Sequence, residues 1–212
     1  GDNVDNDAVT YLQLANALAH ELNNEAITIA EDVSGMPGLT SSIADGGIGF
    51  DYRLGMGLPD FWIKVLKDQP EEQWNMHEFF FAMTNRLPQV KTVAYAESYD
   101  QALVGDVTLA FRLMDKEIYT SMGKSEQNVV VDRGVALHKM IRLFTIVLGG
   151  EAWLNFMGNE FGHPEWIDFP RKDNGWSYKH ARRQWSLVDD KNLKYHWLND
   201  FDNEMLELMK KT

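Results

Sequence analysis

Three short apolar runs, each followed within a few positions by an acidic residue, are the most regular feature of the hydrophobic pattern. The runs span residues 26–30, 91–96 and 152–157, and the acids that follow them are Glu31, Glu97 and Glu160. Near-continuous hydrophobicity is typical of strands covered on both faces of a parallel sheet, and the turn-forming residues behind each run mark its end. An alternating run at residues 50–54 predicts a further, short strand.

Segments with helical spacing of apolar residues separate the predicted strands. In the first, at residues 5–22, Asn6 or Asp7 is a suitable N-cap. In the predicted helix at residues 74–87, Phe79, Phe80 and Met83 share the side that we expect to face the core. A polar loop is expected at residues 121–128. The predicted helices span residues 5–22, 59–67, 74–87, 109–119, 132–148, 178–187 and 191–210.

Strands that alternate with helices predict an α/β protein with a parallel sheet. Only about four strands are visible, whereas a closed (β/α)8 barrel needs eight strands and roughly 250 residues. Either part of a barrel is missing from these 212 residues or the sheet is open. No linker or low-complexity tract divides the chain, so we treat residues 1–212 as one unit.

Composition excludes several classes of partner. The 32 acidic and 20 basic residues give a net charge of −12, which disfavours nucleic acid and anionic membranes and suits a neutral substrate. The chain has no Cys, so disulfides and thiolate metal sites are excluded. No membrane span or signal peptide is visible, and a first residue of Gly rather than Met is consistent with a partial chain.

Two further patterns do not predict a ligand site. His163, Glu165 and Asp168 lack the spacing of a metal site, and the glycines of residues 46–49 do not form a phosphate-binding loop between strand and helix. We expect His138, within the helix at 132–148, to be a packed or surface residue rather than a ligand.

Glu31 is the first side chain after a predicted buried strand. In barrels of parallel strands the chemistry lies at the carboxyl ends of the strands, so a carboxylate there is a candidate functional group. A structural role fits this stretch equally well, with the acid capping the next turn or pairing with a neighbouring Arg.

Five strings in the chain resemble the eukaryotic-type 1,4-α-glucan branching enzymes of the α-amylase superfamily. They occur in the family's order and with similar spacing across nearly the whole chain, and the last is the most specific to glycogen and starch branching enzymes. The strings are TIAEDVSGMP (28–37), GFDYRL (49–54), NMHEFFFAMTNR (75–86), AYAESYDQALVGD (94–106) and LNFMGNEFGHPEWIDFPR (154–171).

This resemblance implies that residues 1–212 are the C-terminal half of a catalytic (β/α)8 barrel, with strands five to eight and their helices. It implies cleavage of an α-1,4 bond, a covalent glycosyl intermediate, and transfer to a glucan 6-hydroxyl. The implied partners are an α-glucan (glycogen, amylose or starch) and the missing barrel half, with no cofactor and no metal. The implied location is the cytoplasm or a plastid.

The resemblance assigns two catalytic residues to this chain. Glu31 matches the general acid/base, which needs a raised pKa, and we expect partial burial and nearby carboxylates to supply it. Asp100 matches the acid that grips the sugar hydroxyls and stabilises the transition state. Retaining chemistry also needs a nucleophilic carboxylate about 5 to 5.5 Å from the acid. In the family that Asp lies on the fourth strand, which this chain lacks.

The chain departs from the family at Tyr99, where the pattern has a His that donates to the sugar. Tyr donates through its hydroxyl but is longer and carries no positive charge. Asp51 superficially resembles the nucleophile, but Gly49 stands where that string has an Arg, and the residues that follow match the sixth strand. We therefore do not assign Asp51 as the nucleophile.

Weaker candidates lie near the last strand. Asn159 and Glu160 are predicted at the active rim, where contact with a sugar and positioning of the loop are equally good interpretations. Trp166, Trp176 and Trp185 have aromatic faces that suit a sugar ring, but core or loop packing is the interpretation that we prefer for each of them.

Two other functions stay open. A catalytically incomplete glucan-binding or structural fragment is favoured by the absent nucleophile and by Tyr99. An amylase-like hydrolase would share the same acids. Transfer rather than hydrolysis is implied by the resemblance alone.

Overall fold

The fold is built around a parallel sheet. The structure is a computed structural model that describes residues 4–87, 89–100, 107–165 and 167–211. Within these residues, four strands pair in the order of the chain, β1 (Ile29–Ala30), β2 (Tyr52–Leu54), β3 (Thr92–Ala94) and β4 (Ala152–Trp153). All three pairings are parallel, which confirms the predicted α/β class.

The strands are shorter than the apolar runs that predicted them. The run at 26–30 contributes only β1 (Ile29–Ala30), and the run at 152–157 contributes only β4 (Ala152–Trp153). These two strands lie at the ends of the strand order, so each has a single hydrogen-bonding neighbour among the described residues. The longer β2 and β3 each pair on both sides.

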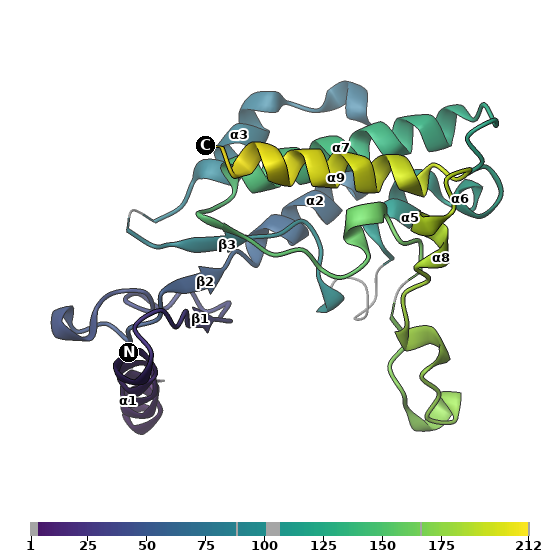
Figure 1. Ribbon diagram of the computed structural model, residues 1–212. Helices are drawn as coiled ribbons and strands as arrows, with labels where there is room; N and C mark the ends of the chain where they lie inside the picture. The colour runs from purple at the N-terminus through teal and green to yellow at the C-terminus, as the bar shows by residue number, and fades with distance from the viewer. Residues whose placement is uncertain (1–3, 88, 101–106, 166, 212) are drawn as a thin grey trace.

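Helices connect the strands and cover one side of the sheet. In Figure 1, α7 and α9 run alongside each other above the strands, whereas α1 lies apart, next to β1. No helix in the described part of the chain is both long and apolar enough to cross a membrane. The helices are α1 (Asn6–Leu22), α2 (Gly57–Asp68), α3 (Met76–Thr84), α5 (Leu109–Met114), α6 (Glu117–Thr120), α7 (Val129–Leu148), α8 (Ser186–Asp189) and α9 (Tyr195–Met209).

Several predicted helix boundaries are wrong. Asp5, rather than Asn6 or Asp7, caps α1, because its Oδ1 accepts from the amides of Asp7 and Ala8 at 3.0 and 3.1 Å. The helix predicted at 109–119 breaks at Asp115, whose φ of 49° ends α5.

The helix predicted at 178–187 is also wrong. The segment has only a 3-10 turn at Lys179–Ala181 before α8 begins at Ser186. Between them Arg183 turns inward and donates to backbone carbonyls of the preceding loop, which an uninterrupted helix would prevent.

The main core lies between the sheet and the helices. Trp62 of α2 is fully buried and donates through Nε1 to Thr145 of α7 at 2.8 Å, and the ring of Phe79 meets Trp62 edge to face. Met83 is buried as predicted, but Phe80 is 54% exposed, so the apolar side of α3 is narrower than its sequence indicates.

The turn between α7 and β4 requires glycine. A Cβ on Gly150 would lie 2.2 Å from the carbonyl oxygen of Thr92, the first residue of β3. Only a residue without a side chain allows this approach of backbone to backbone. Gly150 therefore lets β4 enter the sheet directly beside β3.

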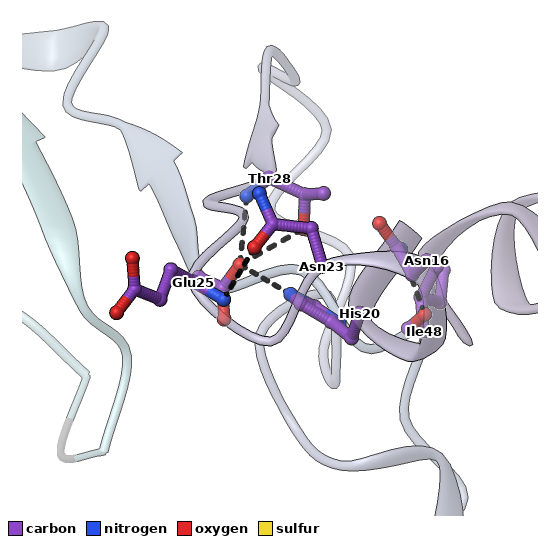
Figure 2. A network of polar contacts seen from close by, with 7 residues as sticks. Asn16, His20, Asn23, Glu25, Thr28 and Ile48 are labelled. Atoms are coloured by element: carbon purple, nitrogen blue, oxygen red, sulfur yellow. Dashed lines mark hydrogen bonds and ion pairs between the residues drawn. The ribbon is translucent and has the colours of Figure 1, made fainter. Parts of the chain in front are cut away.

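The first helix is tied to the amino ends of the first two strands by polar contacts. Asp51 accepts from the Thr28 amide at 2.7 Å and from His20 Nε2 at 2.8 Å. Figure 2 shows His20 and Thr28, which make these contacts, and the hydrogen bond that Asn16 donates to the carbonyl of Ile48. Although partial burial opposes it, hydrogen bonds from Thr28 and His20 lower the pKa of Asp51.

We expect Asp51→Ala to weaken the attachment of α1 to the sheet. Loss of the acceptor leaves the Thr28 amide without a partner and lowers the free energy of unfolding by about 1 to 2 kcal/mol. Urea unfolding measures the loss. Asp68→Ala, at the exposed end of α2, is the matched control and is expected to change stability little. Equal stability of the two variants would contradict the structural role of Asp51.

Candidate active site

The carboxyl ends of β1 and β3 bring three of the predicted site residues together. Glu31 directly follows β1, and Tyr99 and Asp100 lie shortly after β3. The negative charges of Asp100 and Glu31, together with hydrogen bonds to both, raise the pKa of the Tyr99 hydroxyl. That hydroxyl is therefore a shared neighbour of two carboxylates that are far apart in the sequence.

Tyr95 forms the buried floor next to this group. It comes directly after β3, and its side chain is 1% exposed. Burial, and then the charges of Asp100 and Glu31, raise the pKa of Tyr95 to about 12. Two tyrosines thus have the same two acids as electrostatic neighbours. We call Glu31, Tyr95, Tyr99 and Asp100 the rim cluster.

The pairing with a neighbouring Arg that the sequence allowed for Glu31 is made by Asp32 instead. Asp32, not Glu31, lies next to Arg53, whose Nη2 donates to the Asp32 carbonyl at 2.9 Å and lies 3.5 Å from its carboxylate. Ser34 also donates to Asp32 at 2.9 Å. The expected partial burial of Glu31 is wrong, because the residue is exposed at the end of an edge strand.

Asp51 lies at the other edge of the sheet from the rim cluster. It precedes β2 and binds Thr28, which precedes β1, whereas Glu31 follows β1. In a parallel pair these positions are at opposite ends of the strands. Its contacts with His20 and Thr28 give Asp51 a structural role, in agreement with its rejection as a nucleophile.

Asn159 and Glu160 mainly contact the loop that contains them. One carboxylate oxygen of Glu160 accepts from Asn155 at 2.9 Å and from the Gly158 amide at 2.8 Å. Asn159 is buried and donates to the carbonyl of Glu97 at 3.4 Å. These contacts position the loop after β4, and a sugar contact from either residue stays a prediction.

A buried polar group behind the rim was missed by sequence reasoning. Glu97 accepts from the Leu109 amide and is 5% exposed. Burial raises the pKa of Glu97 to about 7, while the Leu109 hydrogen bond and the charges of Arg183 and Arg142 limit the rise. The only signal in the sequence is an acid directly behind a strand.

Arg183 and His163 connect the long loop after β4 to its own base. Arg183 Nη1 lies 3.0 Å from His163 Nδ1 and donates to the carbonyl of Glu165 at 2.7 Å, and its Nε donates to Met157 at 2.9 Å. Burial, and then the charge of Arg183, lower the pKa of His163 to about 4. His163 is therefore neutral near pH 7.

The other sequence candidates have packing roles or lie outside the described residues. Trp185 packs its ring 5.4 Å from that of Phe161, and His138 is buried in α7. Trp166 lies outside the described residues. Within the described ranges, no group of three or more His, Asp or Glu side chains has an arrangement that suits a metal ion.

Glu31 and Tyr99 of the rim cluster are exposed at the surface of the described part of the chain. Two cavities of about 500 and 600 Å3 lie beside α2 and beside β4, and neither is lined by Glu31, Tyr99 or Asp100.

These observations define an α/β protein that gathers carboxylates at the carboxyl edge of a parallel sheet, where barrel enzymes place their chemistry. No protein-family profile matches the chain. Curated relatives match 98% of it and are 1,4-alpha-glucan-branching enzymes: one from Rhizophagus irregularis at 58% identity, one from Felis catus at 60% and one from Solanum tuberosum at 58%.

The chain belongs to the 1,4-α-glucan-branching enzyme family. It spans 31%, 30% and 24% of the length of these three relatives, respectively. The family is thus established over nearly the whole chain, whereas the activity of a complete protein is a separate question.

We expect Glu97 to make stability depend on pH in a defined direction. Its pKa is raised from 4.5 to about 7, so its contribution to stability is full below about pH 4.5 and is lost as pH rises through about 7. Glu97→Gln stays neutral, so its stability relative to the parent is expected to rise across that interval. Urea unfolding at several pH values measures the difference.

Glu204→Gln, an exposed position in α9, is the control for the Glu97 measurement. Its stability relative to the parent is expected to stay constant between about pH 4.5 and 7. A constant difference for Glu97→Gln as well would show that Glu97 does not titrate in this range.

Proposed function

We propose that this chain is the C-terminal half of a catalytic (β/α)8 barrel that cleaves an α-1,4-glucan and transfers the cleaved segment to a 6-hydroxyl. The observation that carries the proposal is the convergence of Glu31 and Asp100 on Tyr99 at the carboxyl edge of the sheet. The parallel order of β1 to β4 fits strands five to eight of a barrel.

In this mechanism Glu31 is the general acid and base. It protonates the departing glycosidic oxygen, and it later accepts the proton of the incoming 6-hydroxyl. Asp100 binds sugar hydroxyls as positive charge develops on the ring in the transition state. Both carboxylates have the Tyr99 hydroxyl as a neighbour, which supports a shared sugar site.

A nucleophilic Asp completes the retaining mechanism and is contributed by a part of the barrel that these residues do not include. It attacks the anomeric carbon as Glu31 protonates the leaving oxygen, and a covalent glycosyl intermediate forms. The acceptor hydroxyl then displaces that Asp while Glu31 takes its proton. Each bond that forms replaces one that breaks, and Glu31 returns to its starting protonation state, so the proposed reaction needs no cofactor.

The two free sides of the sheet support association with the missing barrel half. At one side the apolar residues Leu14, Leu18 and Leu22 of α1 are more than half exposed, and Ile29 of β1 is 47% exposed. At the other, a cavity of about 600 Å3 opens between β4 and α9. Exposed apolar surface next to an edge strand is typical of an interface.

A catalytically incomplete glucan-binding fragment is the second candidate. The absence of an assigned nucleophile favours it, and so does Tyr99, which stands where the family pattern has a His. Loss of iodine colour from amylose, without new reducing ends, supports branching. Colour loss with accumulating reducing ends indicates a hydrolase instead, and unchanged colour with retained binding indicates the fragment.

We expect Glu31→Gln to lower transfer by about 10²- to 10⁴-fold in the longest natural polypeptide that contains this chain, because Gln transfers no proton. Branch formation from amylose is the measurement. Glu25→Gln, an exposed acid shortly before β1, is the matched control and is expected to leave the rate unchanged. Equal rates for the two variants would exclude Glu31 as the acid.

We expect Tyr99→Phe to slow transfer by roughly tenfold, because it removes the hydroxyl that lies between two carboxylates. Tyr99→His restores a donor that also carries charge, so it is expected to match or exceed the parent below about pH 6.5 and to lose that advantage above it. The pH profile of branch formation tests both variants. Parental activity in Tyr99→Phe would show that the hydroxyl is not used.

A further inference from the structure

The loop that follows β4 projects away from the body of the molecule and carries exposed aromatic side chains. Figure 1 shows it at the lower right, coloured green, between β4 and α8. Trp176, Tyr178 and Phe169 are 66%, 67% and 52% exposed, respectively. Among the described residues, most of the Trp176 side chain therefore faces solvent.

Trp176 has an unfavourable backbone conformation. Its φ is 59°, in the left-handed region that bulky residues rarely adopt. Such strain persists only where the surrounding structure imposes it, and it is often found at binding sites. A glycine would fit this position without strain, so the exposed indole needs another explanation.

Asn174 imposes this conformation by linking four positions of the loop. Its Oδ1 accepts from the amides of Arg171 and Ser177 at 2.9 and 3.3 Å. Its Nδ2 donates to Asp168 Oδ2 at 3.1 Å and to the Phe169 carbonyl at 2.9 Å. These contacts fix the backbone on both sides of Trp176 and bring the segments of Phe169 and Tyr178 toward the same residue.

The base of the loop is fixed to the candidate active site. Arg183 binds the carbonyls of Met157 and Glu165, and Asn159 at the start of the loop binds the carbonyl of Glu97 behind the rim cluster. Trp176 therefore lies on a loop whose base is fixed by hydrogen bonds and which begins at the edge of the sheet where Glu31 and Asp100 lie.

We propose that Trp176, flanked by Phe169 and Tyr178, is a stacking platform for glucose units of an α-glucan chain at a distance from the reacting bond. An exposed indole offers a flat apolar face to the C–H face of a pyranose, and the Tyr hydroxyl offers a hydrogen bond. An uncharged polymer is also the ligand that suits a chain with a net charge of −12. The proposal rests on the proposed function for its ligand.

The test is affinity electrophoresis in gels that contain amylopectin, with maltoheptaose as competitor, on the longest natural polypeptide that contains this chain. Trp176→Gly is expected to weaken binding by roughly three- to tenfold, whereas Trp176→Phe keeps most of the affinity. Phe80→Ala removes a ring of α3 that is 54% exposed and is the control, with unchanged affinity expected.

The Trp176→Gly substitution distinguishes an effect on folding from an effect on glucan binding. Gly adopts a φ of 59° without steric strain, and this relief offsets its larger loss of conformational entropy on folding. Trp176→Gly is therefore expected to melt close to the parental temperature while it binds less glucan. A lower melting temperature with unchanged affinity would overturn the proposal and return Trp176 to a packing role. A change of oligomeric mass with unchanged affinity would overturn it in favour of a protein contact.

Failure of the platform is distinguishable from failure of the proposed function. The Glu31→Gln variant is expected to bind amylopectin as the parent does, and to lose that affinity when Trp176→Gly is added. If no branching occurs but Trp176→Gly still weakens binding, the platform is supported without the enzyme. If branching occurs and Trp176→Gly binds as the parent does, the platform alone is overturned.

Discussion

The parallel pairing of four strands is the constraint on which the rest of the structure depends. Because Ile29 pairs with Tyr52, Arg53 with Thr92 and Val93 with Ala152, the strands end at one edge of the sheet. Residues that follow different strands thereby become neighbours. Glu31 lies near Tyr99 and Asp100 for this reason, since it is far from both of them in the sequence.

The sequence predicts those features that depend on local pattern. A buried strand needs an apolar run, so the strands and the residues behind them were located correctly, although the paired parts are shorter. Features that depend on distant partners were missed. Asp115 breaks a helical pattern through a left-handed φ, and Arg183 leaves helical geometry to bind carbonyls of a loop that begins more than twenty residues earlier.

The same distinction applies to the site. Glu31, Tyr99 and Asp100 were predictable because each follows a strand and matches a family string. Glu97 and His163 also lie in family strings, but their sequence positions do not reveal that they are buried. Their burial and perturbed pKa values, and the contact of His163 with Arg183, depend on tertiary structure. The sequence pattern therefore identifies the residues of the rim cluster that follow strands, whereas the buried groups behind them require the tertiary structure.

Glu31 and the exposed apolar residues Leu14 and Leu18 of α1 belong to the part of the molecule around β1, which has a single hydrogen-bonding neighbour among the described residues. An edge strand leaves a row of backbone groups available for pairing, and exposed apolar surface next to it is typical of an interface. Surface buried at such an edge would also lower the local dielectric constant, and a lower dielectric strengthens the interactions between charged groups. The pairing of β1 and the electrostatic environment of the residues that follow it are therefore linked.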